Sequence, residues 1–193
     1  GETRQGLPQI AGGKVGLQAF GITEPTTGSD TTQLKTRATR TANGYRLDGQ
    51  KVWTSRAQHS DLMLVLARTT PASEVKNKAD GVSTFLIDIR ECLGRGLTIR
   101  PIKAMVNHHA TEVFFESLEI PADALIGEEG KGFRYILDGL NAERMITAAE
   151  AIGSTRWFVR KATAYAKERV VFKRPIGANQ AIQFPIALSH VQM

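Results

Sequence analysis

Hydrophobic and polar positions alternate in short runs from about residue 17 to residue 120. The runs are rich in β-branched and aromatic residues and are separated by Gly, Pro, Asn or Asp, as is typical of strands bounded by turns. Asn43-Gly44 between two runs predicts a tight hairpin. The predicted strands are residues 17–22, 35–41, 45–55, 62–69, 82–89, 97–103 and 111–120. Because no helical pattern separates them, they favour an antiparallel barrel or sandwich.

Beyond Pro121 the apolar residues follow a helical period. The pattern runs without proline from Phe133 to about Val170. A helix of ~38 residues would span ~57 Å, so it must pack against other helices. Pro175 then interrupts the pattern, and a second helix is predicted from Asn179 or Gln180. The fold class predicted is α+β, an antiparallel β domain followed by long helices.

The segment "GITEPTTGSD", residues 21–30, ends the first predicted strand with short hydroxyl side chains and two chain-bending residues. Pro25 fixes φ and Gly28 tolerates positive φ, so the segment is a turn in the simplest interpretation. The alternative is a binding site in which hydroxyl and backbone N–H groups face a ligand rich in hydrogen-bond acceptors. The segment alone favours the simple turn.

The composition of the chain bears on which ligands it could bind and on whether it could span a membrane or form a disulfide. The net charge is +6, from 25 basic and 19 acidic residues, but the basic residues are scattered. That distribution fits a phosphorylated small molecule better than nucleic acid. No apolar run approaches the ~18 residues of a membrane-spanning helix. The one cysteine, Cys92, excludes an intramolecular disulfide.

The chain begins with Gly1 and shows no signal peptide, and its last ten residues form an amphipathic helical pattern without a cap. We therefore expect a piece of a longer protein.

Candidate catalytic groups are few. His108 and His109 are adjacent and lack a third ligand at useful spacing, so no metal site is predicted. Glu143 lies in a mostly apolar helical stretch, where a carboxylate could act as a desolvated general base. Alternatively, it belongs to a solvated polar stripe with Thr147, Glu150 and Ser154, which fall at helical spacing on one face. Periodicity alone favours the stripe.

Four stretches occur in an order and spacing that resemble the acyl-CoA dehydrogenase family of flavoproteins. They are "AFGITEPTTGSD", "YRLDGQKVWTS", "GEEGKGF" with "LNAER", and "YAKERVVFKRPIGANQAIQFPIA". The resemblance implies an antiparallel β-barrel-like middle domain between two all-helical domains. Residues 1–16 would end the N-terminal helical domain, residues 17–125 would form the middle domain, and residues 126–193 would begin the C-terminal all-α bundle.

The resemblance also implies roles for individual residues. Phe20, Ile22 and Thr23 would line the flavin ring of FAD, and Ser29 would contact the FAD phosphates or the CoA arm. The Trp53 indole would flank the flavin ring, the Ser55 hydroxyl would lie near its N5, and Thr54 between them would also contact the cofactor. The segment that reaches the FAD of a neighbouring subunit would comprise Arg169, Val171, Phe172, Asn179 and Gln180. Lys173 departs from the glycine usual in the family after this Phe, so the following turn is expected to differ.

Glu143 matches the position at which isovaleryl- and long-chain-type members carry the catalytic base, directly before an arginine, and this resemblance favours the base over the stripe. Asn141 and Arg144 match positions used against the acyl-CoA substrate. The implied reaction is α,β-dehydrogenation of a fatty acyl-CoA to the trans-2-enoyl-CoA, with Glu143 removing the α-proton and hydride passing to flavin N5. The alternatives are an acyl-CoA oxidase or flavin monooxygenase of the same fold, or a catalytically silent binding protein.

The implied partners are an electron-transfer flavoprotein or similar acceptor and further copies of the chain in a homodimer or homotetramer. Neither nucleic acid, a metal nor a membrane span is expected. The expected location is the cytoplasm, or the mitochondrial matrix if a transit peptide has been removed.

Overall fold

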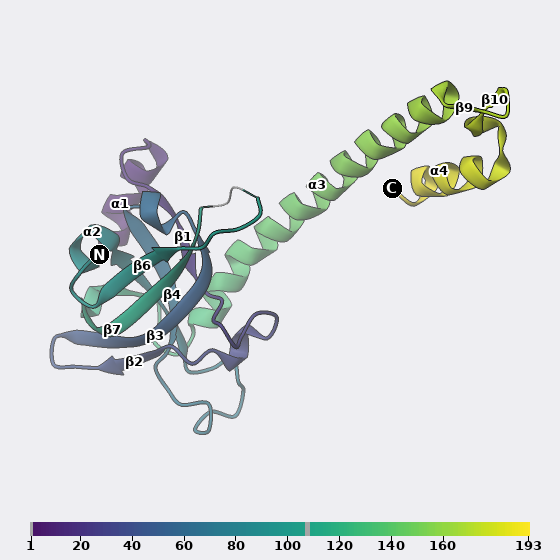
Figure 1. Ribbon diagram of the computed structural model, residues 1–193. Helices are drawn as coiled ribbons and strands as arrows, with labels where there is room; N and C mark the ends of the chain where they lie inside the picture. The colour runs from purple at the N-terminus through teal and green to yellow at the C-terminus, as the bar shows by residue number, and fades with distance from the viewer. Residues whose placement is uncertain (1, 107–108) are drawn as a thin grey trace. The chain divides into compact units, whose positions relative to one another are not determined.

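The alternating runs form strands where the sequence predicts them, and the helical pattern forms one long helix (Figure 1). The structure, a computed structural model, describes residues 2–106 and 109–193. They divide into two units, residues 1–137 and residues 138–193.

The first unit is built around one sheet. Its strands are β1 (Leu17–Gly21), β2 (Arg37–Arg40), β3 (Gly44–Ser55), β4 (Leu62–Arg68), β5 (Val82–Asp88), β6 (Leu97–Pro101), β7 (Ala110–Pro121) and β8 (Leu125–Ile126). They lie in the order β6-β7-β3-β2-β4-β5-β8, and β1 pairs with β4. Two helices belong to the same unit, α1 (Glu2–Ala11) and the short α2 (Ile89–Cys92).

Most neighbouring strands are antiparallel, which confirms the predicted fold class. Two pairings differ, because β1 and β2 each run parallel to β4. The alternation of apolar and polar residues indicates which face of a strand is buried, but it carries no information about the direction of the neighbouring strand. The sequence therefore could not predict these two parallel pairings. Among the described residues the sheet is open, with β6 and β8 at the ends of its order.

The core of this unit comes from the inward-facing positions of the long strands. Tyr45, Leu47, Met63, Phe85 and Val113 are at most 1% exposed. The Tyr45 and Phe85 rings pack edge to face, with centroids 4.9 Å apart. This apolar layer fixes the register of β3, β4, β5 and β7, since a slip of one residue would turn every side chain to the other face.

The link between β5 and β6 contains a short helix as well as turns. Asp88 ends β5 and accepts hydrogen bonds from the backbone N–H groups of Arg90 (2.8 Å) and Glu91 (3.2 Å). This N-cap starts α2, a helix of four residues, before the turn at Gly94.

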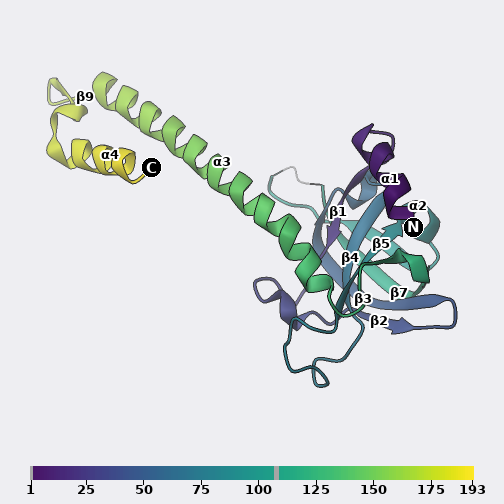
Figure 2. The ribbon, with the colours of Figure 1, turned by 180° about the vertical axis from the view of Figure 1, so that it is seen from behind.

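Helix α3 (Gly132–Glu168) begins in the first unit and continues into the second. In the second unit it is followed by a two-stranded hairpin, β9 (Val170–Val171) and β10 (Arg174–Pro175), and by α4 (Gln180–Gln192). Figure 2 shows α4 turning back beside the last turns of α3. Gly177 permits this approach, because a Cβ there would lie 2.9 Å from the carbonyl oxygen of Ala166. The predicted long helix and the predicted start of the second helix are both confirmed.

Candidate functional site

In the first unit a hydrogen bond brings together the two segments that were predicted to line the flavin ring, residues 20–23 and residues 53–55. The backbone N–H of Val52, in β3, donates to the carbonyl oxygen of Thr23, just beyond β1, at 2.9 Å. Phe20 on β1 is 37% exposed and Trp53 on β3 is 58% exposed. Large exposed aromatic side chains on neighbouring segments are an unusual feature of a folded sheet and are typical of a binding surface.

A β-bulge gives β3 its shape at this point. The register between β3 and β7 shifts between Lys51 and Thr54, and Trp53 lies within the shift with a φ of 61°. Positive φ is costly for a bulky side chain, and such backbone strain is concentrated at functional sites.

The bulge is followed by alternating exposure. Trp53 and Ser55 are exposed, whereas Thr54 between them is 1% exposed. The Thr54 hydroxyl is buried and has no hydrogen-bond partner in the part of the chain that the structure describes. The predicted flavin contact of Thr54 remains a prediction.

The turn at residues 21–30 uses several of its polar groups to hold itself together. Glu24 and Thr27 exchange backbone hydrogen bonds of 2.9 and 3.0 Å. The Asp30 carboxylate accepts from the Thr32 backbone N–H at 3.2 Å and starts a short 3-10 helix. Ser29 is exposed between them. The simple turn interpretation therefore accounts for Thr27 and Asp30, while Ser29 remains available for a ligand.

Below this turn lies a buried ion pair that the sequence analysis missed. The Lys51 ammonium lies 2.8 Å from the Glu24 carboxylate, and the two side chains are 0% and 4% exposed. The ammonium also donates to the carbonyl oxygen of Ile22 at 3.1 Å. One signal was present in the sequence: Lys51 is in phase with Tyr45 and Leu47, which alternate toward the core.

The environment of this pair changes both pKa values. Burial lowers the pKa of Lys51 to about 8, although the nearby Glu24 charge opposes the change. Burial raises the pKa of Glu24, but the charge and hydrogen bond of Lys51 and the hydrogen bonds from Lys35 and Thr36 outweigh it. The net pKa of Glu24 is therefore below its ordinary value.

The second unit carries the predicted substrate and base residues. Asn141, Glu143 and Arg144 are exposed on α3, as is every residue from 141 to 150. Met145 and Ile146 in this stretch are 69% and 68% exposed.

The remaining predicted residues gather at the hairpin after α3. Phe172 at its tip is 95% exposed, and Phe172 and Lys173 both have positive φ, 50° and 64°. The Asn179 side chain accepts from Arg174 at 2.7 Å and donates to the carbonyl oxygen of Ile176 at 3.1 Å. Arg169 meets Ile176 across the hairpin through a backbone hydrogen bond of 2.8 Å. Arg169, Val171 and Phe172 thus lie at the hairpin, and Asn179 and Gln180 lie at the start of α4, which follows it after a short 3-10 helix.

Two protein-family models match the chain, one over most of the strands of the first unit and the other from just before α3 to the last residue. Residues 19–118 match the family model described as "Acyl-CoA dehydrogenase, middle domain", and residues 130–193 match "Acyl-CoA dehydrogenase, C-terminal domain". The chain belongs to the acyl-CoA dehydrogenase family. The middle-domain match covers most of the sheet of the first unit but not β8, and the second match begins just before α3.

Individual members of the acyl-CoA dehydrogenase family are similar over nearly all of the chain. The cyclohex-1-ene-1-carbonyl-CoA dehydrogenase of Syntrophus aciditrophicus is 34% identical over 94% of this chain and 43% of its own length. The mitochondrial long-chain specific acyl-CoA dehydrogenase of Mus musculus is 34% identical over 94% of this chain and 41% of its own length. The crystal structure of acyl-CoA dehydrogenase from Geobacillus kaustophilus matches with a TM-score of 0.85 at 29% identity, over 98% of this chain and 49% of that one. The chain thus spans about half the length of these relatives.

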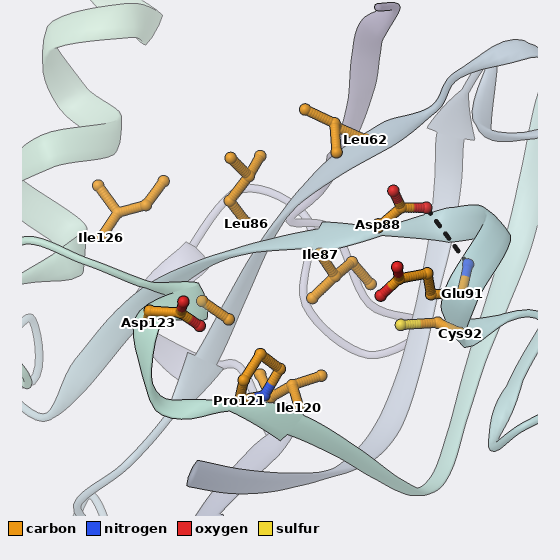
Figure 3. Close-up of a pocket in the computed structure, with 11 residues that line it drawn as sticks. Leu62, Leu86, Ile87, Asp88, Glu91, Cys92, Ile120, Pro121, Asp123 and Ile126 are labelled. Carbon is orange, nitrogen blue, oxygen red and sulfur yellow. Dashed lines mark hydrogen bonds between the residues drawn. The ribbon is translucent and has the colours of Figure 1, made fainter. Parts of the chain in front are cut away.

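A separate hollow of about 300 Å³ lies in the first unit, and none of the predicted site residues lines it (Figure 3). Its lining combines aliphatic side chains such as Leu62 and Ile87 with the carboxylates of Asp88, Glu91 and Asp123. Cys92 also faces it, and burial followed by the charges of Asp88 and Glu91 raises the pKa of its thiol to about 11. A protonated, buried thiol is a poor nucleophile, so we assign no chemistry to this hollow.

The described residues offer neither a cluster of metal ligands nor a helix suited to crossing a membrane. Residues 2–106 and 109–193 contain no group of three or more His, Cys, Asp or Glu side chains placed to hold a metal ion. No helix in the same residues has the length and apolar character needed to cross a bilayer. His109 packs edge to face on His59, with ring centroids 4.6 Å apart, and His108 lies outside the described residues.

Proposed function

We propose that the protein to which this chain belongs is an FAD-dependent dehydrogenase that converts a fatty acyl-CoA thioester to the trans-2-enoyl-CoA. The observation that carries the proposal is the junction of Thr23 with the strained bulge at Trp53, in a chain of this family. At this junction, exposed aromatic side chains and hydroxyl groups come from two segments that are far apart in the sequence.

The residues at this junction fit a flavin. A flavin ring offers a flat aromatic face and a pyrimidine edge rich in acceptors. The exposed aromatic rings of Phe20 and Trp53 suit the face. The hydroxyls of Thr23 and Ser55 can donate hydrogen bonds, as can the backbone at Ile22. We propose that Thr54, in the same segment as Trp53 and Ser55, also contacts FAD. Ser29 would contact the phosphates of FAD or the arm of CoA.

The hairpin of the second unit supplies the other part of the proposed FAD site. Arg169, Val171, Phe172, Asn179 and Gln180 would contact the FAD of a neighbouring subunit, which requires a homodimer or homotetramer. The almost fully exposed Phe172 side chain supports an intermolecular role. The electron acceptor would be an electron-transfer flavoprotein or a similar protein.

Glu143 is the proposed base. Its carboxylate would take the proton from the α-carbon of the thioester while Asn141 and Arg144 hold the acyl-CoA. Bound FAD would supply the acceptor for the hydride that leaves the β-carbon. Hydrogen bonds to the thioester carbonyl must strengthen as negative charge develops on it.

Within this family the chain's relatives act on different acyl groups according to their names, one cyclic and one long-chain. We therefore propose the thioester class and not an acyl chain length. We also propose that residues 1–16 end a helical domain, that residues 17–125 are the middle domain and that residues 126–193 begin the C-terminal bundle. The proposed location is the cytoplasm or the mitochondrial matrix.

The test is anaerobic bleaching of the flavin absorbance by a panel of acyl-CoA thioesters, with the full-length wild type and the Glu143→Gln variant. Wild type should bleach with its substrate, and Glu143→Gln should bleach about 10²- to 10⁴-fold more slowly, the usual contribution of a general base. Glu150→Gln is the matched control, because Glu150 is exposed on the same helix.

Three outcomes would contradict parts of the proposal. Equal bleaching of wild type and Glu143→Gln would assign Glu143 to a solvated stripe. A wild type that binds FAD but bleaches with no thioester would favour a silent binding protein. Consumption of oxygen during turnover would favour an oxidase or monooxygenase.

A further inference from the structure

The buried Glu24–Lys51 ion pair lies between the two segments that form the proposed flavin site. Glu24 belongs to the turn after β1, and Lys51 belongs to β3 two residues before Trp53. The pair is therefore placed to control how the turn and the strand meet.

Glu24 holds the turn through three donors. One carboxylate oxygen accepts from the Lys51 ammonium at 2.8 Å and from the Thr36 backbone N–H at 2.9 Å. The other oxygen accepts from the Lys35 backbone N–H at 2.6 Å. The Glu24 carboxylate thus connects the turn both to β3, through Lys51, and to residues 35–36, which follow the turn.

Lys51 acts on the other side of the junction. Its ammonium donates to the carbonyl oxygen of Ile22 at 3.1 Å as well as to Glu24. Next to it, the Val52 N–H donates to Thr23. Consecutive residues of β3 therefore hold the backbone of residues 22 and 23 and the side chain of residue 24, directly before the bulge that exposes Trp53.

Fold stability alone does not account for such a pair. Removing two charges from water is costly, and well-packed neutral residues of similar size usually serve a core as well or better. What the ion pair adds is a directional link between two backbone segments. We infer that Glu24 and Lys51 are positioning residues that set the spacing between Ile22–Thr23 and Trp53–Ser55 for the flavin ring, an inference that rests on the proposed function.

The experiment compares two double variants of the full-length protein. Glu24→Gln/Lys51→Met removes both buried charges together, so that neither is left unpaired in the interior. Asp80→Asn/Lys131→Met is the matched control, because that ion pair is also in the first unit but its side chains are 44% and 49% exposed. The measurements are the thermal unfolding midpoint, the dissociation constant for FAD on reconstitution of the apoprotein, and the visible absorbance spectrum of the bound flavin.

We expect the buried-pair variant to bind FAD about tenfold or more weakly, as the loss of one charge-assisted hydrogen bond would produce. Its flavin spectrum should shift, and the control should retain wild-type affinity and spectrum. Should the double variant fail to fold, the same measurements on Glu24→Asp decide the question, because this variant keeps both charges and shortens the carboxylate side chain by one methylene.

A folded buried-pair variant with wild-type affinity and spectrum would overturn the positioning role and leave the proposed function intact. Equal loss of FAD binding in the control variant would also overturn it, since the effect would not be specific to the junction. A wild type that takes up no FAD would overturn the proposed function itself.

Discussion

Two buried threonine hydroxyls of the first unit differ in whether they have a hydrogen-bond partner. Thr111 and Thr54 are both buried on paired strands, and the Thr111 hydroxyl donates to the Thr54 carbonyl oxygen at 2.8 Å. The Thr54 hydroxyl has no such partner among the described residues. An unsatisfied buried hydroxyl costs about 1–3 kcal/mol, so this position is a local defect of the core.

Replacement of Thr54 by Val should therefore increase the free energy of unfolding by about 1 kcal/mol, because the methyl group needs no partner. Urea unfolding measures the change. Thr111→Val is the matched control and should lower the free energy of unfolding by about 1 kcal/mol, since its hydrogen bond is lost. A loss of stability in Thr54→Val would show that its hydroxyl has a partner.

Cys92 should react slowly with thiol reagents. Its pKa is raised from 9.0 to about 11, so about a hundredfold less thiolate is present at pH 8 than in the unfolded chain. The rate of alkylation at pH 8, with and without denaturant, measures this difference. Comparable rates in both conditions would contradict the burial of the thiol.

The same shift has a consequence for stability. Between pH 9 and about 11 the unfolded chain releases the thiol proton while the folded chain keeps it. This contribution to stability is present below pH 9 and is lost as the pH rises through about 11. A Cys92→Ala variant should lack this component of the pH dependence.

At the scale of the elements, two side-chain hydrogen bonds connect the start of α3 to β5. The Ser83 hydroxyl accepts from the Gly130 N–H at 2.8 Å, and the Thr84 hydroxyl donates to the Gly132 carbonyl oxygen at 3.0 Å. A Cβ on Gly132 would lie 2.3 Å from the Thr84 backbone nitrogen. The helix therefore begins against β5 at a distance that only glycine permits.

We expect Gly132→Ala to lower the free energy of unfolding by about 2 kcal/mol or more, because backbone atoms must move to relieve the overlap. Gly139→Ala is the control on the same helix, since nothing lies within 4 Å of its added Cβ. It should raise stability by about 0.5–1 kcal/mol through better helix propensity. Thermal and urea unfolding compare the two, and equal effects would contradict the close approach at Gly132.

The β9–β10 hairpin offers a second element-scale prediction. Lys173 has a φ of 64°, a conformation that favours glycine over side chains with a Cβ. Lys173→Gly should stabilise the hairpin by up to about 1 kcal/mol, less the extra entropy of glycine in the unfolded chain. Amide hydrogen exchange at β9 and β10 measures it. Lys161→Gly, within α3, should destabilise instead.

At the scale of the whole chain, the two units differ in how much apolar surface they bury. The core residues of the first unit are almost fully buried, whereas residues 141–150 of α3 are exposed on every face. A helix without tertiary packing is only marginally stable in water. Its exposed Met145, Ile146 and Phe158 are typical of a surface that other structure covers.

Hydrogen exchange of the chain of residues 1–193 should therefore be uneven. Amides in β3, β4, β5 and β7 should exchange slowly, and amides between residues 139 and 158 should exchange much faster, because opening there exposes little buried surface. Mass spectrometry of exchanged peptides measures both regions in one experiment. Equal protection of α3 and β4 would contradict the expectation.

The sequence by itself determined the fold class, the strands β1 to β7 and the helices α3 and α4, but it did not predict the helices α1 and α2 or the short strands β8, β9 and β10. Alternation predicted the strands, helical spacing predicted α3 and α4, and four motifs in order indicated the acyl-CoA dehydrogenase family. These features depend on residues close together in the chain, where side-chain period, capping and turn preference act directly. The motifs also named the candidate residues from Phe20 to Gln180, whose roles stay predictions.

Only the tertiary structure decided which distant residues meet. The parallel pairing of β1 with β4, the bond from Val52 to Thr23 and the burial of Lys51 against Glu24 depend on strand register and packing across many residues. A lysine is ordinarily a surface residue, and only a carboxylate brought from elsewhere in the chain makes its burial tolerable. Local pattern carries no information about such a partner, because the contact exists only once the sheet has formed.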